Sequence, residues 1–119
     1  MEINERKRLS GMLGFATRAG KITVGTDLVC RAMPSGKVKL VIISSEASDS
    51  TKKKLTVKSE FYGIKFLVLD IGTEELGRIV GRSFATATVA VSEETSKGLR
   101  IEQVVEELAS RHKPGWKKH

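Results

Sequence analysis

The sequence contains few of the side chains from which metal sites and covalent catalytic centres are built. Among its 119 residues there is one cysteine, and the two histidines, His112 and His119, both lie in the C-terminal segment 112–119. A single cysteine forms no internal disulfide, which accords with a reducing compartment. This set of side chains is also too small for an ordinary structural zinc site. We therefore expect neither a metal nor a cofactor.

Long apolar runs and nucleotide-binding loops are also missing. No stretch approaches the roughly 18 to 20 apolar residues of a membrane-spanning helix, and the first six residues, MEINER, lack the apolar core of a secretory signal. Neither G-x-G-x-x-G nor G-x-x-x-x-G-K-S/T occurs, which excludes the usual dinucleotide and nucleoside-triphosphate cradles. We therefore expect a cytoplasmic protein with no membrane partner.

Candidates for catalysis are correspondingly few. Cys30 would need a nearby base to act as a nucleophile, and the sequence around it offers none, so we expect a small, buried apolar residue. Asp70, Glu74 and Glu75 lie around an expected helix start, where carboxylates usually interact with the helix dipole. We predict no catalytic residues and no enzymatic activity, and turnover that depended on Cys30 would contradict this.

Acidic residues are outnumbered, and the excess of positive charge is concentrated. The chain has 21 Lys and Arg against 14 Asp and Glu, a formal net charge of +7. Residues 1–39 hold eight basic side chains and three acidic ones, and residues 111–119 hold four basic side chains and no acid. Although a single cluster such as Lys52-Lys53-Lys54 is usually a solvated face, the overall distribution predicts a polyanionic partner.

Helix and strand patterns alternate along the chain. One helix face is formed by apolar residues at i, i+3, i+4 and i+7: Leu9, Met12, Leu13 and Ala16. The run Leu40-Val41-Ile42-Ile43 is apolar throughout, as expected of a central strand that is covered on both faces. Such patterns predict helices at about 4–18, 26–33, 49–61, 73–80 and 101–108 and strands at 21–24, 38–43, 64–69 and 86–91.

This alternation predicts an α/β fold, a three-layer α/β/α sandwich around a four-stranded sheet. We expect the sheet to be mixed rather than purely parallel because the first strand is so short. No internal repeat or change of composition divides the chain. We therefore predict a single domain over residues 1–111, followed by a basic, flexible tail at 112–119.

The junction between the first strand and the second helix has the features of an anion-binding corner. Gly25 allows a ligand to approach the backbone closely, Thr26 is expected to be the N-cap of the helix, and Arg31 follows about one turn later. A helix start also presents unpaired N–H groups and the positive end of its dipole. On the inner side of this helix we expect three apolar residues to be buried, Leu28, Val29 and Ala32.

The same corner resembles a known family. The resemblance is carried by residues 25–32 (GTDLVCRA), 35–43 (SGKVKLVII), 44–48 (SSEAS), 75–81 (ELGRIVG) and 88–91 (TVAV). In order and spacing they resemble the ribosomal protein superfamily typified by the archaeal L-seven-Ae and eukaryotic L-thirty-e proteins. Residues 49–55 (DSTKKKL) resemble its bacterial YlxQ-like branch. The likeness spans about residues 13–91 and implies an RNA-binding module that recognises kink-turns and is associated with ribosomes or their assembly.

The resemblance also implies which residues contact RNA. Gly25 stands at the family's position of close approach, Asp27 and Leu28 at its Asn and Glu positions, and Arg31 at its Lys. The family's second RNA-facing loop corresponds to Arg82, Ser83, Phe84, Ala85, Thr86 and Ala87. The predicted RNA-binding residues are therefore Gly25, Thr26, Asp27, Leu28, Arg31, Lys21, Lys37, Arg82, Ser83, Phe84, Ala85 and Thr86.

Each side-chain type has an expected contribution. An arginine such as Arg31 matches the O6 and N7 edge of guanine or a phosphate, whereas Lys21, Lys37 and Arg82, expected near the corner, would attract phosphates without sequence preference. Phe84 either stacks on an unpaired base or folds back onto the core.

Two departures from the family pattern suggest an altered specificity. Asp27 only accepts hydrogen bonds where Asn also donates, and Leu28 removes a polar base contact. We therefore hypothesise that the protein reads RNA shape with fewer base contacts, or reads an RNA other than an ordinary kink-turn. The alternative function is a protein-interaction module on the same fold without specific RNA recognition. In either case we expect a monomer.

Overall fold

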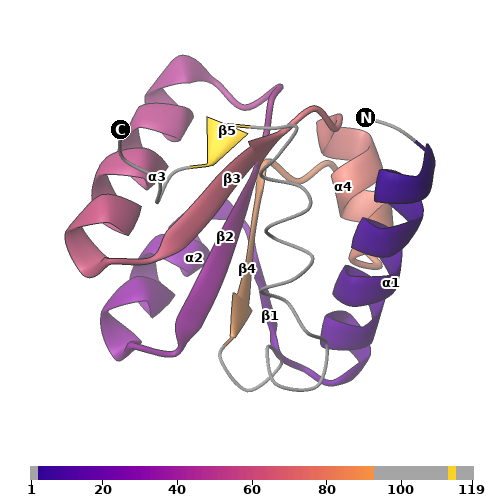
Figure 1. Ribbon diagram of the computed structural model, residues 1–119, viewed down its shortest axis with the longest axis horizontal. Helices are drawn as coiled ribbons and strands as arrows, with labels where there is room; N and C mark the ends of the chain where they lie inside the picture. The colour runs from indigo at the N-terminus through magenta and orange to yellow at the C-terminus, as the bar shows by residue number, and fades with distance from the viewer. Residues whose placement is uncertain (1–2, 93–112, 115–119) are drawn as a thin grey trace.

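A mixed β-sheet runs through the middle of the molecule (Figure 1). The computed structural model describes residues 3–92 and 113–114. The strand order is β1-β4-β2-β3-β5, and the strands are β1 (Ile22–Val24), β2 (Val38–Ser44), β3 (Lys65–Leu69), β4 (Thr88–Ser92) and β5 (Lys113–Pro114). β2 and β3 are parallel, whereas β4 runs antiparallel to both β1 and β2. The predicted mixed character of the sheet is therefore confirmed.

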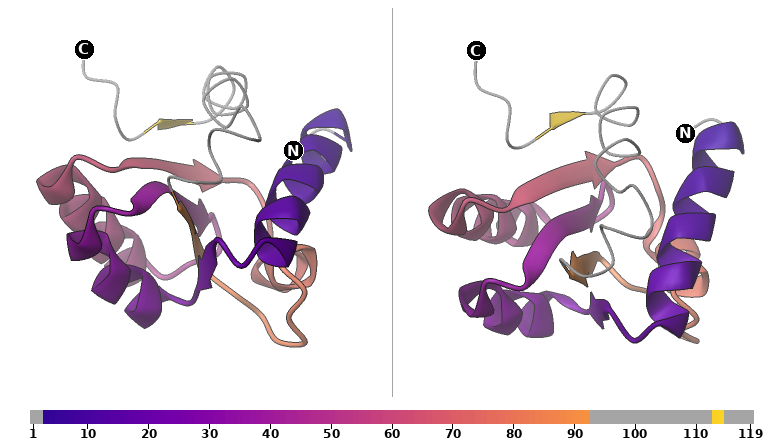
Figure 2. Two further views of the ribbon diagram at one scale, coloured as in Figure 1. Left: turned by 90° about the horizontal axis from the view of Figure 1, so that it is seen from below. Right: turned by 60° about the horizontal axis from the view of Figure 1, so that its bottom comes forward.

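Helices cover both faces of the sheet, as two further views show (Figure 2). Helices α1 (Ile3–Arg18) and α4 (Thr73–Ile79) lie on one face. Helix α2 (Thr26–Ala32), the 3₁₀ turn η1 (Met33–Ser35) and helix α3 (Asp49–Tyr62) lie on the other. This arrangement confirms the predicted three-layer α/β/α sandwich. Within the described ranges, no helix combines the length and the apolar character that a membrane span requires.

Each face of the sheet has its own apolar core, and strand β2 contributes to both. Leu40 and Ile42 are buried against the α1 and α4 side, whereas Val41 and Ile43 are buried on the α2 and α3 side. The exposed fraction of each of the four side chains is 1% or less, which is worth about 1.5 to 3 kcal/mol per side chain. The unbroken apolar run predicted a doubly covered strand, and that prediction is confirmed.

A serine side chain caps the start of α3. Ser48 is its N-cap, and the Ser48 Oγ accepts a hydrogen bond from the Thr51 N–H at 3.1 Å. Helix α4 is capped differently, because the Glu46 Oε1 accepts from the Thr73 N–H at 3.0 Å across a gap of 27 residues. The carboxylate of the loop after β2 therefore sets where α4 begins.

Two details at the C-terminal side of the sheet differ from the expectations. Strand β4 begins at Thr88 rather than at residue 86, because the Thr86 N–H donates to the Thr73 O at 2.9 Å instead of joining the ladder. Lys113–Pro114, within the predicted basic tail, pairs with β3 as a fifth, two-residue strand, and an edge position of this kind tolerates proline. The helix predicted at 101–108 and the boundary predicted after residue 111 lie outside the described residues.

Candidate nucleic-acid interface

Gly25 forms the junction between β1 and α2. Its N–H donates to the Thr88 O at 2.9 Å, and its carbonyl accepts from the Val29 N–H at 2.9 Å. Its φ is +103° and its ψ is 141°, a region of backbone conformation that is open almost only to glycine. A Cβ added there would meet nothing within 4 Å. The requirement for glycine at this corner is therefore conformational rather than steric.

Thr26 has a different role from the one predicted. Gly25 occupies the N-cap position without a side-chain cap, and Thr26 is the first residue of α2. The Thr26 Oγ1 lies 3.0 Å from the Thr88 Oγ1 and shares a hydrogen bond with it. The predicted N-cap was therefore wrong, because the hydroxyl is directed to the neighbouring strand β4. It ties the start of α2 to the sheet.

Helix α2 exposes more of its surface than the sequence suggested. Val29 is fully buried, and Cys30 and Ala32 are half-buried against the same core. Leu28, however, is 54% exposed, so its predicted burial was wrong. In a helix of seven residues, only the face that carries Val29 packs against the sheet. Leu28 therefore lies on the solvent side, as Asp27 and Arg31 also do.

The second predicted loop is held tightly at both ends. Near its start, the Arg82 N–H donates to the Gly77 O at 2.8 Å, and at its end the Ala87 O accepts from the Ser44 N–H at 2.8 Å. Its middle rests on α4, because a Cβ added to Gly77 would lie 2.1 Å from the Phe84 O. Gly77 therefore makes room for this loop. A glycine inside an expected helix, where alanine is favoured, was the signal for such a contact.

The side chains of this loop divide into exposed and buried ones. Arg82, Ser83, Phe84 and Ala85 are exposed. Phe84 is 59% exposed, so of the two alternatives for it, folding back onto the core is not observed. Thr86 is only 4% exposed, so its side chain is not available on the surface as predicted. Its backbone bond to Thr73 makes it an anchor of the loop.

Helix α2 and the loop after α4 form the walls of one open groove of about 590 Å³. Strand β1 lies between α2 and the loop after α4 in the lining of this groove. Arg31 and Leu28 come from one wall and Arg82 and Phe84 from the other. The fold therefore brings together predicted residues that are about fifty positions apart in the sequence. Two cations and two exposed apolar side chains line a single surface.

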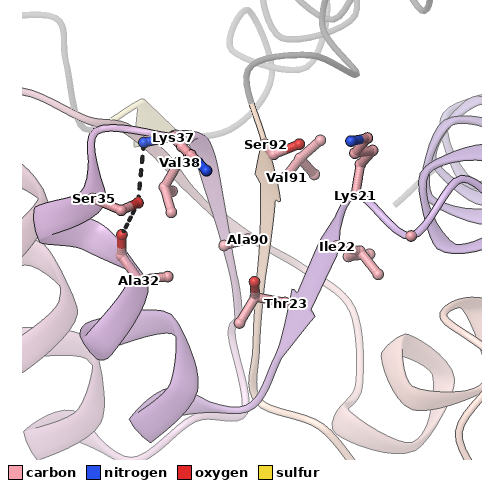
Figure 3. Close-up of a pocket in the computed structure, with 11 residues that line it drawn as sticks. Lys21, Ile22, Thr23, Ala32, Ser35, Lys37, Val38, Ala90, Val91 and Ser92 are labelled. Carbon is pink, nitrogen blue, oxygen red and sulfur yellow. Dashed lines mark hydrogen bonds between the residues drawn. The ribbon is translucent and has the colours of Figure 1, made fainter.

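Lys21 and Lys37 lie elsewhere. They line a neighbouring pocket of about 460 Å³ at the other end of β1, where Figure 3 shows them on either side of the end of β4. The Lys37 N–H donates to the Ser35 Oγ at 3.2 Å, and the Ser35 hydroxyl donates to the Ala32 O at 2.6 Å. The prediction that Lys21 and Lys37 lie at the Gly25 corner was therefore wrong. Both hollows share a lining of Ile22, Thr23 and Ala32.

Asp27 has a partner that the sequence did not indicate. The Lys54 Nζ, on α3, lies 3.9 Å from the Asp27 Oδ1, and the two side chains are 48% and 84% exposed. The contact arises because α2 and α3 lie side by side on the same face of the sheet. One lysine of the cluster 52–54 therefore reaches the predicted RNA-binding corner.

In the part of the chain that the structure describes, no group of three or more His, Cys, Asp or Glu side chains is placed to hold a metal ion. An open groove lined by two arginines from separate segments suits an extended anionic ligand rather than a small enclosed one.

Comparison with known proteins identifies the family. The RNA-binding protein YlxQ of Bacillus subtilis (strain 168) is 35% identical over 83 residues, which cover 70% of this chain and 81% of that protein. The large ribosomal subunit protein eL30 of Sulfolobus acidocaldarius is 29% identical over 84 residues, 71% of this chain and 81% of that protein.

Solved structures agree with this fold. A protein of unknown function from Bacillus halodurans aligns with a TM-score of 0.71 at 34% identity, covering 84% of this chain and 97% of that one. The Giardia lamblia 15.5kD RNA binding protein aligns with a TM-score of 0.77 at 20% identity, covering 92% of each chain, a likeness of fold. The profile of the Ribosomal protein L7Ae/L30e/S12e/Gadd45 family matches residues 7–99. The chain therefore belongs to this family, which confirms the resemblance seen in its sequence.

Proposed function

We propose that this protein binds a structured, kink-turn-like RNA in the groove between α2 and the loop at 81–87. The observation that carries the proposal is that Arg31 and Arg82 line the same groove from opposite walls, with exposed Leu28 and Phe84 beside them. Proteins named for RNA binding are among the relatives of the chain. A sharply bent RNA presents phosphates and unpaired bases close together, and this combination matches cations that alternate with apolar side chains.

The two arginines supply different parts of the binding energy. Arg31 follows the Gly25 corner, where the backbone is free of side-chain bulk, and its guanidinium suits a guanine edge, a contact worth about 1 to 3 kcal/mol of discrimination. Arg82 is anchored through its backbone N–H to Gly77, and it would pair with phosphates in a way that weakens as salt rises. Phe84, exposed on the same wall, offers a stacking surface for an unpaired base.

The pair of Asp27 and Lys54 explains how an acidic residue fits such a corner. An exposed carboxylate repels phosphates, and the Lys54 ammonium at 3.9 Å offsets part of that repulsion. Because neither Asp27 nor Leu28 donates a hydrogen bond from its side chain, fewer base edges are read at this corner. We infer that the protein recognises the shape of the bent RNA more than its sequence.

The proposed setting is the ribosome or its assembly in the cytoplasm. Ribosomal proteins named eL30 are among the relatives, and the lone, half-buried Cys30 accords with a reducing compartment. Both walls of the groove come from one chain. The proposal therefore has the protein act as a monomer and without catalysis.

A direct test compares two RNAs. Gel-shift titration of the protein against a kink-turn RNA and against the same RNA with its sheared G·A pairs disrupted should show tighter binding to the intact kink-turn. Equal, weak binding to both RNAs would remove the claim of kink-turn recognition.

A second test locates the binding face. Arg31→Ala should weaken kink-turn binding about fivefold or more, since a bidentate base contact is worth about 1 to 3 kcal/mol. Lys52→Ala, a charge loss on α3 away from the lining of the groove, is the matched control and should weaken binding by less. The opposite ranking would mean that the interface lies elsewhere.

A further inference from the structure

The C-terminal end of α3 carries an apolar surface outside the RNA groove. Val57 is 59% exposed, Phe61 is 80% exposed and Tyr62 is 40% exposed. The rings of Phe61 and Tyr62 meet edge to face, with centroids 4.9 Å apart and an angle of 89° between their planes. Single exposed apolar residues are common on soluble proteins, whereas a contiguous group marks an interaction site. We refer to these three residues as the α3-end surface.

The fold holds this surface in the solvent. Val57 and Phe61 are four residues apart and share a helix face, while Leu55 and Ser59 of the same helix are buried. Gly63, with φ +67°, ends the helix, and the chain then returns to the core at Ile64. The two rings therefore lie in the last turn of the helix, directly before its glycine C-cap.

A pocket of about 300 Å³ continues the surface. Tyr62 and Gly63 line it together with Met33 and Pro34 of η1 and Ile64 before β3. The lining combines apolar side chains with Lys39 and Lys65, and the volume suits one or two large side chains rather than a long ligand. The pocket supplies a place for an anchoring residue beside the exposed rings.

Basic residues lie near the apolar side chains of the α3-end surface and its pocket. Lys53 and Lys58 lie along α3, and Lys39 and Lys65 line the pocket. Glu60 is the single acidic residue of α3 after its first turn. This surface is therefore complementary to a ligand that combines an apolar anchor with acidic side chains.

The positive charge of the α3-end surface also bears on which ligand it can bind. A second copy of this chain carries a formal charge of +7 and is therefore repelled. RNA would match the lysines, but it gains little from the aliphatic lining of the pocket. In addition, Phe61 and Tyr62 contact each other edge to face rather than standing as two open stacking platforms.

The α3-end surface lies at the opposite end of the sheet from the RNA groove. Its pocket is formed where β2 and β3 begin, at Val38 and Lys65. The Gly25 corner and the loop at 81–87 bond instead to Thr88 and to Ser44, the last residue of β2. The groove and this pocket have no lining residue in common.

We propose that the α3-end surface docks an acidic segment of another protein, which inserts an apolar side chain into the pocket beside Tyr62. The protein would then join an RNA to a protein partner, one at each end of its sheet.

The test uses a displayed library of random 12-residue peptides and the full-length protein. Selection on the protein, with counter-selection on its Phe61→Ser variant, should enrich acidic peptides that carry at least one large apolar residue. Enrichment of basic or neutral peptides, or no enrichment over the variant, would overturn the proposal. Since Phe61 is 80% exposed, this substitution leaves the core intact.

A synthetic, fluorescently labelled copy of the most enriched peptide then locates the site by anisotropy. Phe61→Ser and Lys58→Glu should each weaken its binding at least tenfold, whereas Phe84→Ser, which removes another exposed phenylalanine in the RNA groove, should change it less than twofold. An excess of kink-turn RNA should not displace the peptide. Displacement by the RNA, an unaffected Phe61→Ser variant, or sedimentation that shows self-association through this face would each reject the assignment.

Discussion

The two walls of the proposed RNA groove both depend on a glycine, and for different physical reasons. Gly25, at the start of α2, needs a backbone conformation with φ +103°, and the space around it is open. Gly77, inside α4, is buried in a helix, and an added Cβ would lie 2.1 Å from the Phe84 carbonyl. One glycine gives the chain its turn, and the other makes room for a distant loop.

This difference determines how each wall can fail. A substitution at Gly25 would strain the backbone there and change the local path of the chain at the end of β1. The apolar packing of the neighbouring sheet would remain. A filled Gly77 position instead pushes away the loop that carries Arg82 and Phe84, because backbone atoms cannot yield as a flexible side chain can. The same type of residue therefore supports one wall locally and the other through tertiary contact.

The largest effect is expected for Gly77→Ala. The added methyl group should cost about 3 kcal/mol in free energy of unfolding and should displace the loop, which lowers kink-turn affinity at least tenfold. Thermal unfolding and gel-shift titration measure the two effects. Gly11→Ala is the matched control, because α1 has open space at that position and alanine favours helix by about 1 kcal/mol. If both variants behaved alike, close packing would not be the reason for Gly77.

A smaller effect is expected for Gly25→Ala. The unfavourable φ should cost about 2 kcal/mol in free energy of unfolding, and kink-turn affinity should fall because the corner shifts. Gly36→Ala is the control, since Gly36 also has a positive φ, +77°, with open space around it, and it does not line the groove. That control should lose stability and keep its affinity. If both variants lost affinity, the proposal that the Gly25 corner contacts the RNA would be rejected.

A double-mutant cycle of Arg31→Ala and Arg82→Ala asks whether the two walls hold the same RNA. If one bent RNA contacts both arginines, their effects on affinity should be non-additive by about 1 kcal/mol. Strict additivity, measured by titration at a single salt concentration, would contradict this expected coupling between the two arginines.

The smallest effect is expected for Asp27→Asn. Removal of one exposed carboxylate next to phosphates should tighten kink-turn binding about threefold, in keeping with about 0.6 kcal/mol for an exposed charge pair. The gain should shrink as salt rises. Lys54→Ala should act in the opposite direction, because the carboxylate loses its partner. Tighter binding of Lys54→Ala would show that the pair does not face the RNA.

Prediction from sequence succeeded where a property is local. The apolar run from Leu40 to Ile43 indicated a doubly covered strand, because period and composition report burial directly. It failed where a partner lay far along the chain. Leu28 was assigned to the core although the short α2 turns it outward, and Thr26 was assigned to a cap although its hydroxyl meets Thr88.

By itself, the sequence determined the order of helices and strands, the α/β/α sandwich and the cationic character of the surface, since these follow from local periodicity and from charge that no fold can remove. Only the tertiary structure decided that Arg31 and Arg82 line one groove, that Lys21 and Lys37 do not, and that Lys54 reaches Asp27. The reason is geometric: a groove between segments about fifty residues apart is set by strand register and by backbone contacts such as that at Gly77, and neither leaves a periodic trace in the chain.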